Sequence, residues 1–314
     1  MSPEPRVVLV TGASSGIGRA VAHEAASRGD HLVLVARGES PLQEVAMECR
    51  AGGAASALVI PTDVADDEAV AQCVAHVREV HGRLDAVAHC AGVVAYGRVE
   101  DVPPEIFEGV LRTNLLGSVN VARQVLPLLR EQERGALVLI GSVIGHIATP
   151  SMGPYAVSKW GVRALARQLQ IENRDVRGVG ISYLAPGGVD TPIYEQAANY
   201  AGHVGRPPPP VSSPEHVASL VLRRFDHPRD RSQVGPANGI MRFGFTAMPW
   251  AFDRMVGPLF RVLATDQTRP VAATVGNVLA SQASGNRLHG GQGSSLAGIA
   301  RNTVSRLIPG RRAS

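Results

Sequence analysis

A tyrosine and a lysine four residues apart, Tyr155 and Lys159, have the types and spacing best suited to proton transfer. On a helix, residues i and i+4 lie on one face about one turn apart. Lys159 is the only lysine among 31 basic residues, the other 30 being arginines. A chain that otherwise uses arginine thus keeps one compact point charge, at a position beside a phenol.

The charge of Lys159 is expected to change the acidity of Tyr155. A free tyrosine titrates near 10, and an ammonium at about 4 Å, with an effective dielectric near 20, favours the phenolate by about 4 kcal/mol. This interaction would bring the pKa of Tyr155 near neutrality, where a general acid–base works best.

Two further polar residues suit a role in the same chemistry. Ser142 ends a predicted strand, where its hydroxyl would donate a hydrogen bond to a reacting carbonyl oxygen. A hydrolase elbow, G-x-S-x-G, is excluded because Gly141 is one residue before this serine and Gly145 three after it. Asn114 falls within a predicted helix, where asparagine is a poor helix former. Its amide has either a function or only a structural place in the core.

A glycine-rich turn follows the first predicted strand and leads directly into a helix. It reads Thr11-Gly12-Ala13-Ser14-Ser15-Gly16-Ile17-Gly18. Glycines let the backbone approach a pyrophosphate, and a helix N-terminus presents free N–H groups to it. The spacing departs from G-x-G-x-x-G, and such a turn can also be purely structural.

The end of the second strand distinguishes between the two nicotinamide dinucleotides. NAD-selective sites place a carboxylate there for the ribose 2′-hydroxyl, whereas this strand ends in Ala36 and is followed by Arg37. The guanidinium of Arg37 suits a 2′-phosphate, and the alternative is an exposed arginine without a ligand. Asp63 and Val64, after the third strand, are placed to meet the adenine, although Asp63 also suits a helix N-cap.

These residues need a scaffold of parallel strands, and the apolar pattern predicts one. Unbroken Val- and Leu-rich runs alternate with amphipathic stretches of helical length, which is typical of a sheet covered on both faces. The expected strands are residues 7–10, 32–35, 57–60, 84–88, 136–140 and 178–184, with a short one near 233–234. The expected helices are residues 17–28, 41–50, 67–81, 106–130, 154–172 and 214–225. Right-handed crossovers then give a Rossmann-type, doubly wound α/β sheet. The loop 190–213 is predicted to be a substrate lid.

The chain has 314 residues and a mean hydropathy near zero, which allows one large core. No apolar run is long enough to span a membrane and no signal peptide is recognisable, so we expect a cytoplasmic protein. The three cysteines are far apart and are expected to be reduced core thiols, with no metal site. Residues 254–314 carry a formal charge of +7, so the preceding part carries −3.

The C-terminal region changes character three times. Residues 240–263 hold four of the six phenylalanines, three of the six methionines and one of the two tryptophans. This cluster is a lid, an oligomer contact, a membrane-surface patch or a helix packed on the core. Residues 281–295 have the composition of a flexible linker. Beyond them, Leu296, Ile299, Thr303 and Leu307 recur at helical spacing beside arginines, which suits either contact with anionic lipid or a solvated end.

The ordered motifs together resemble those of the short-chain dehydrogenase/reductases over residues 6–237. They are Thr11-Gly12-x-x-x-Gly16-x-Gly18, Asn114, Ser142, Tyr155-x-x-x-Lys159 and Pro186-Gly187-x-Val189-x-Thr191. The resemblance implies that Tyr155 is the acid–base, that Lys159 also binds the nicotinamide ribose, and that Ser142 orients the substrate. It also implies that Asn114 holds a proton-relay water, and that Pro186, Gly187 and Thr191 lie beside the nicotinamide. One departure is His89-Cys90-Ala91-Gly92 in place of Asn-Asn-Ala-Gly, which we expect to weaken a polar contact in the sheet.

The sequence therefore predicts an NADP(H)-dependent oxidoreductase with a domain at 1–237 and an extension at 238–314. Its substrate is expected to be a small, lipophilic carbonyl compound or secondary alcohol. We expect no nucleic-acid partner, a homo-oligomer, and a peripheral membrane contact through the extension. The predicted cofactor-binding residues are Gly12, Ser14, Ser15, Gly16, Ile17, Gly18, Arg37, Asp63, Val64, Ala91, Gly92, Tyr155, Lys159, Pro186, Gly187, Val189 and Thr191. The alternatives are a dinucleotide-binding sensor without turnover and a membrane-associated scaffold.

Overall fold

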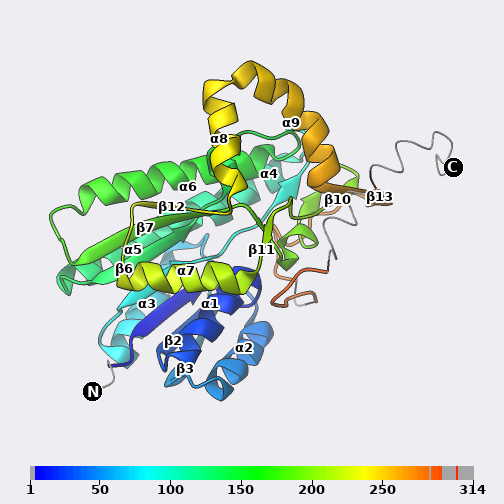
Figure 1. Ribbon diagram of the computed structural model, residues 1–314. Coiled ribbons are helices and arrows are strands. Elements are labelled where there is room, and N and C mark those ends of the chain that lie inside the picture. Colours follow the sequence, from blue (N-terminus) through cyan, green and yellow to red (C-terminus); the bar gives the residue numbers. More distant parts are fainter. Residues whose placement is uncertain (1–3, 283, 292–301, 303–314) are drawn as a thin grey trace.

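A central parallel sheet organises the protein, seen in a computed structural model that describes residues 4–282, 284–291 and 302 (Figure 1). Its strand order is β12-β7-β6-β4-β1-β2-β3, and every neighbouring pair is parallel. The strands are β1 (Val7–Thr11), β2 (His31–Ala36), β3 (Ser56–Pro61), β4 (Ala86–His89), β6 (Gly135–Ile140), β7 (Val179–Pro186) and β12 (Arg231–Val234). The order reverses between β1 and β4, where ligands of doubly wound folds bind. The predicted Rossmann-type fold is confirmed.

Helices cover both faces of this sheet and bury two apolar clusters. On one face lie α1 (Gly16–Ser27), α2 (Glu39–Ala51) and α7 (Pro214–Asp226). On the other lie α3 (Asp67–His81), α5 (Gly117–Glu131) and α6 (Gly153–Glu172), with α4 (Pro104–Leu111) beside α6. β1 is buried along its whole length, which explains its unbroken run of apolar residues.

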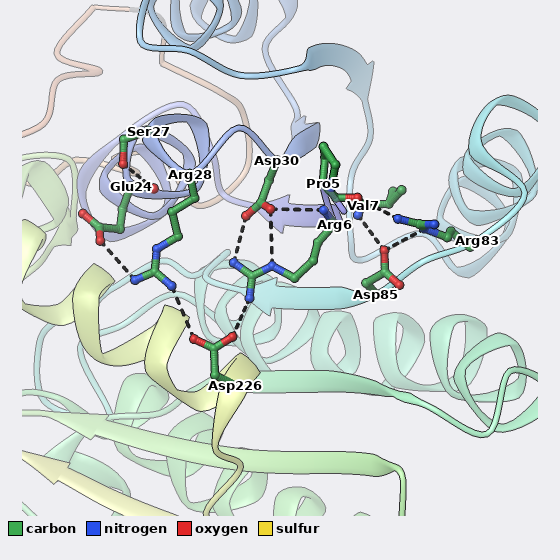
Figure 2. Close-up of polar contacts among 10 residues, drawn as sticks. All are labelled: Pro5, Arg6, Val7, Glu24, Ser27, Arg28, Asp30, Arg83, Asp85 and Asp226. Atoms are coloured by element: carbon green, nitrogen blue, oxygen red, sulfur yellow. Dashed lines mark hydrogen bonds and ion pairs between the residues drawn. The ribbon is translucent and has the colours of Figure 1, made fainter. Parts of the chain in front are cut away.

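Ion pairs fasten the amino ends of the strands, at the edge opposite the predicted site (Figure 2). Arg6, just before β1, pairs with Asp30 at 2.9 Å and with Asp226 at the end of α7 at 2.8 Å. The carboxylate of Asp85 accepts a hydrogen bond from the backbone N–H of Val7 at 2.8 Å. Asp30 and Asp226 thus join the start of β1 to the segment before β2 and to a covering helix.

The loop expected to act as a lid contains several short strands. They are β9 (Ala198–Asn199), β10 (His203–Gly205) and β11 (Val211–Ser212). β9 pairs with β5 (Ala95–Tyr96), β11 pairs with β8 (Gly188–Val189), and β10 pairs antiparallel with β13 (Thr265–Pro270). Two of these pairings anchor the loop to the domain, and the pairing of β10 with β13 joins it to the extension.

The aromatic segment after β12 forms two helices, α8 (Ala237–Ala247) and α9 (Pro249–Leu263), which stand out from the body in Figure 1. Every residue of α9 is at least partly exposed. Phe245 packs edge-on against Trp160 of α6 with ring centroids 6.0 Å apart, while Ile240 and Trp250 are 77% and 74% exposed. The alternative of a helix packed into the domain's core is therefore wrong for most of this segment.

The segment after β13 returns to the sheet. Within the expected linker at 281–295, residues 286–291 make hydrogen bonds to the domain, and the expected flexibility stays a prediction. Composition predicts how readily a segment bends, whereas these contacts depend on partners far away in the sequence. The helical pattern at Leu296, Ile299, Thr303 and Leu307 lies outside the described residues. Every helix among the described residues is too short or too polar to cross a lipid bilayer.

Candidate active site

The glycine-rich turn connects β1 to α1 in very little space. Gly12 has φ +67°, and a Cβ on it would lie 2.8 Å from the backbone N of Ala91. A Cβ on Gly18 would lie 2.1 Å from the carbonyl oxygen of Gly12. Side chains at these two positions are excluded, so the backbone of the turn closes tightly at the N-terminus of α1.

A cavity of about 140 Å³ lies between this turn and the carboxyl ends of β2, β3 and β4. Predicted cofactor residues that line it are Gly12, Ser14, Ser15, Gly16, Ile17, Gly18, Arg37, Asp63, Val64, Ala91, Gly92 and Thr191. Other lining residues, which the sequence did not indicate, include Thr62, Thr113, Gln196, Asn277, Ser281, Gln282 and Asn286. The predicted residues Tyr155, Lys159, Pro186, Gly187 and Val189 lie outside its lining. Its lining offers backbone N–H groups of a helix N-terminus and a guanidinium, a donor set that fits the phosphates of a dinucleotide.

Tyr155 and Lys159 both lie on α6 and are buried, with 9% and 5% of their surface exposed. The Nζ of Lys159 donates to the carbonyl oxygen of Ile140, at the end of β6, at 2.9 Å. The same Nζ is 5.7 Å from the centre of the Tyr155 ring. A Cβ on Gly92 would stand 3.7 Å from this Nζ, so the lysine reaches the wall of the cavity.

The pKa of Tyr155 differs from the expectation drawn from sequence. Burial raises it to about 12, and a hydrogen bond with Ser142, rather than the ammonium of Lys159, opposes that rise. Burial also lowers the pKa of Lys159 to about 8. The expectation of a phenol near neutrality was wrong because it counted the attraction of the charge and omitted the loss of solvation.

Ser142 lies two residues after the end of β6, close to the strand end where it was predicted, and is buried. Its Oγ accepts a hydrogen bond from the backbone N–H of Ile144 at 3.2 Å and caps a short 3-10 turn. Tyr183 of β7, which the sequence did not single out, packs against the backbone of Gly141. A Cβ on this glycine would lie 2.1 Å from the ring. The hydroxyl of Tyr183 also donates to the carbonyl oxygen of Ser142 at 3.4 Å, so it supports the turn that presents this serine.

Asn114 lies in a π-helical turn, Arg112–Leu116, between α4 and α5. Its Nδ2 donates to the carbonyl oxygen of Val93 and to Ser158 Oγ, both at 2.9 Å. Its Oδ1 accepts from the backbone N–H of Val93 at 2.8 Å. The amide therefore joins α6 to the segment after β4, and the wider turn, of a kind often found at functional sites, supplies the room.

Arg37 and Asp63 both line the cavity, and each makes hydrogen bonds within the protein. The guanidinium of Arg37 donates to the carbonyl oxygens of Asn277 at 2.5 Å and Val278 at 3.2 Å. Asp63 accepts from the backbone N–H of Ala65 at 2.9 Å, whereas the N-cap of α3 is Asp66. The N-cap alternative for Asp63 is therefore wrong.

His89 makes a polar contact between two strands, and the expected weakening of that contact stays a prediction. Thr11 Oγ1 and His89 Nδ1 are 2.9 Å apart, and the same Oγ1 accepts from the backbone N–H of Ala91 at 3.2 Å. Burial lowers the pKa of His89 to about 3, so its ring is neutral and its Nδ1 shares one hydrogen with Thr11 Oγ1, as donor or acceptor according to the tautomer. A neutral histidine thus makes the polar contact that joins β1 to β4.

The segment Pro186–Thr191 begins with the last residue of β7, at the same edge of the sheet. A Cβ on Gly187 would lie 2.8 Å from Asn238 Oδ1, and Asn238 Nδ2 donates to the carbonyl oxygen of Ala185 at 3.0 Å. Thr191 faces the glycine-rich turn, since a Cβ on Gly16 would lie 3.1 Å from its Cβ. Asn238, on α8, was not indicated by the sequence and joins the extension to this segment.

Comparisons with known proteins agree with this architecture. The family model described as short chain dehydrogenase matches residues 6–200. A sepiapterin reductase from Chlorobaculum tepidum is 31% identical over 229 residues, which are 71% of this chain and 91% of that protein. A 3-ketodihydrosphingosine reductase from Bos taurus is 30% identical over 258 residues, 78% of this chain and 77% of that protein.

Solved structures are similar over most of the chain. An alcohol dehydrogenase from Thermococcus sibiricus, complexed with 5-hydroxy-NADP, has a TM-score of 0.63 at 30% identity and covers 74% of this chain and 96% of its own. A short-chain dehydrogenase from Streptomyces avermitilis has a TM-score of 0.69 at 25% identity and covers 80% and 95%. With its family match, its sheet and its glycine-rich turn, the chain belongs to the short-chain dehydrogenases, oxidoreductases that bind a nicotinamide dinucleotide.

Proposed function

We propose that this protein is an NADP(H)-dependent oxidoreductase that interconverts a lipophilic carbonyl compound and its secondary alcohol. The observation that supports this most is the pair Tyr155 and Lys159, both buried on α6, with the Nζ of Lys159 beside Gly92 at the cavity wall. A non-catalytic sensor would have no use for a buried phenol and a buried amine at this place.

Held at the glycine-rich turn and Arg37, a dinucleotide would supply or accept the hydride, and the residues of the chain would move the proton. In the reducing direction, Tyr155 Oη donates its proton to the carbonyl oxygen as the carbonyl carbon gains the hydride, so that an alcohol forms. Ser142 donates a hydrogen bond to the same oxygen, and the charge of Lys159 stabilises the developing phenolate. A phenol with a pKa of about 12 is protonated at neutral pH, which suits the reducing direction.

Asn114 is proposed as the residue that keeps this arrangement aligned. Both of its amide donor contacts, to Val93 and to Ser158, are made inside the protein. Ser158 lies between Tyr155 and Lys159 in sequence, so the contact fixes the turn of α6 that carries the pair. The water-holding role implied by the family resemblance stays a prediction.

Arg37 is expected to favour NADPH over NADH. A charge-assisted contact with the 2′-phosphate contributes about 1.5 to 3 kcal/mol, which is roughly ten- to a hundredfold in affinity. Arg37→Ala should bring the ratio of the two dissociation constants, measured by quenching of intrinsic fluorescence, close to one. Arg37→Lys keeps the charge and should keep part of the preference. Equal constants in the unmodified protein would contradict the assignment.

The surroundings of Tyr155 support a lipophilic substrate. Val94, Tyr96, Met152 and Ala197 form an apolar cluster with Tyr155, and Phe260 of α9 packs against it. Burial of apolar substrate surface contributes about 25 cal/mol per Å² to binding.

A screen of aldehydes, ketones and secondary alcohols with NADPH and NADP⁺ tests the proposed reaction. We expect kcat/KM to rise with the length of an apolar substituent in a homologous series of ketones, by several-fold per added methylene. Phe260→Ser should flatten that rise. Turnover confined to free sugars or other highly polar substrates would count against the lipophilic assignment.

The helices α8 and α9 support a peripheral contact with anionic membranes, which we propose as a property of the extension. They expose Ile240, Phe243 and Trp250 and carry three arginines against one aspartate. Apolar side chains next to a net positive charge fit a lipid surface. Trp250→Ser should lower co-sedimentation with phosphatidylserine vesicles several-fold, and equal co-sedimentation of both proteins would contradict it. The homo-oligomer stays a prediction for sedimentation velocity to test.

A further inference from the structure

Residues 274–282 and 284–291, here together called the strap, supply part of the wall of the cavity. Figure 1 draws it in orange to red after β13. It begins at Thr274, whose N–H and carbonyl both bond to Asn199 of β9. Asn277 donates its N–H to the carbonyl oxygen of Gln196 at 2.9 Å, and the side chain of Val278 is 3% exposed in an apolar cluster. The first part of the strap is therefore firmly held.

The strap makes a hydrogen bond to the N-terminus of α1, which faces the cavity. The backbone N–H of Gly16, at the first position of α1, donates to the carbonyl oxygen of Arg287 at 3.0 Å. Free N–H groups and the positive end of the helix dipole make this the place where a pyrophosphate binds. A carbonyl oxygen of the chain itself stands there in this structure.

The strap also binds the positively charged guanidinium at the other end of the cavity. Arg37 donates to the carbonyl oxygens of Asn277 and Val278. Among the described residues, this guanidinium makes no ion pair. Burial lowers its pKa. The two groups best suited to the phosphates of NADP(H), one N–H and one guanidinium, are thus both bound by strap carbonyls.

The volume of the cavity leads to the same conclusion. It measures about 140 Å³ with Asn277, Ser281, Gln282 and Asn286 among its walls. Sites for ligands of drug size measure roughly 300 to 1,000 Å³, and a dinucleotide is at least that large. The strap in this position and a bound dinucleotide therefore exclude each other.

The second part of the strap is held by surface ion pairs and by hydrogen bonds from residues 286–291 to the domain. Arg287 pairs with Glu195, and His289 lies 3.2 Å from Asp190 and 2.8 Å from Glu215. All of these side chains are at least partly exposed, and such pairs contribute little to stability. The part after Gln282 can thus swing away from Gly16, whereas Arg37 itself must turn from the carbonyl oxygens of Asn277 and Val278 to reach a 2′-phosphate.

We propose that the strap is an internal competitor of the dinucleotide, which must displace it to bind. The proposal rests on the dinucleotide site of the proposed function. It predicts that the affinity for NADP(H) is set by the difference between dinucleotide contacts and strap contacts at the same groups. An element that only clamps a dinucleotide already bound would have the opposite effect on affinity.

A reversible cross-link tests the proposal directly. A Cβ on Gly38 would lie 2.9 Å from Ser281 Oγ, which matches the separation of about 3 Å between one Cβ and the partner's sulfur in a disulfide. The variant Gly38→Cys/Ser281→Cys, oxidised without dinucleotide, should lose at least a hundredfold in NADPH affinity by titration calorimetry. Dithiothreitol should restore it. Undiminished binding by the oxidised variant would overturn the proposal.

The controls separate this proposal from the proposed function. The single variants Gly38→Cys and Ser281→Cys, treated with the same oxidant, should bind as they do when reduced. If the reduced double variant and the parent protein both bind neither NADPH nor NADH, the dinucleotide site itself is refuted. Loss of binding that appears only on oxidation would concern the strap alone.

A milder variant should shift the balance in the other direction. Arg287→Ala removes the pair with Glu195 and should tighten NADPH binding about two- to fivefold, because an exposed pair contributes little. Hydrogen exchange at residues 284–291 should accelerate at the same time. Arg78→Ala breaks a more exposed pair, with Glu131 of α5, and should change neither quantity. Weaker or unchanged NADPH binding by Arg287→Ala, with faster exchange, would overturn the competition.

Discussion

A Tyr155→Phe protein should bind NADPH with the affinity of the parent and turn over its substrate at least a hundredfold more slowly. General acid–base catalysis contributes about 10²- to 10⁴-fold, and the proposed proton donor is the hydroxyl that this change removes. The ring lies in an apolar cluster, so phenylalanine keeps the packing and the fold. Single-turnover measurements at saturating NADPH separate the loss in chemistry from any change in binding.

The matched control is Tyr200→Phe, which removes a hydroxyl from another tyrosine of the same region. Tyr200 packs against a different apolar cluster, formed around Val93 and Ile106, and its variant should stay within about twofold of the parent. A Tyr155→Phe protein that binds NADPH and still works within about tenfold of the parent would show that the proton comes from elsewhere.

Lys159→Met should cost about 3 kcal/mol of transition-state stabilisation, roughly a hundredfold in kcat. This figure follows from one charge at 5.7 Å from the phenol ring with an effective dielectric near 20. The dissociation constant of NADPH should rise as well, if the lysine also binds the nicotinamide ribose. The Tyr155→Phe/Lys159→Met double variant should be scarcely slower than Tyr155→Phe alone, because the two residues act as a unit.

The pH dependence identifies the charge on Lys159 as the active form. The pKa of this amine is lowered to about 8, so the group is charged below pH 8 and neutral above it. The rate of carbonyl reduction should therefore fall as the pH rises through about 8, and Lys159→Met should be slow at every pH without that fall. Lys159→Arg stays charged throughout, so whatever activity it keeps should be flat from about pH 7 to 9.5. A parent profile without a fall near 8 would refute the assignment.

The strands and most helices could be predicted because each depends on a local pattern. β1 and β2 are unbroken apolar runs that only a buried parallel strand accommodates, and α3 begins at a capping aspartate and ends at a glycine with φ +67°. The candidate acid–base pair could be found for the same reason, since the i,i+4 spacing on a helix is itself local.

The π-helical turn at Asn114 could not be predicted from the periodicity. One helix was expected over residues 106–130, whereas the structure divides it into α4, a wider turn and α5. The apolar positions before and after the turn fit a single 3.6-residue repeat closely enough to hide one added residue. Only the partners of Asn114, on a strand and on α6, make the wider turn favourable.

The pKa of Tyr155 and the course of the strap depend on the assembled structure. The spacing of Tyr155 and Lys159 gives their proximity but not the loss of solvation, which reverses the direction of the shift. Residues 281–291 are rich in glycine, serine, asparagine and glutamine, a composition typical of linkers. Their bonds to Gly16 and Asp190 come from residues about 100 to 270 positions away, beyond the reach of any local pattern.

The burial of Lys159 makes a lysine-specific protease a probe of one place in the molecule. Such an enzyme has a single target bond in the whole chain, after residue 159, because the other 30 basic residues are arginines. The bond lies within α6, where cleavage requires the helix to unravel at the centre of the candidate active site. Digestion therefore gives two fragments of 159 and 155 residues, at a rate proportional to the fraction of molecules in which α6 is open. Following the two bands on a gel over time would measure how firmly the lysine is held, with neither a label nor a substrate.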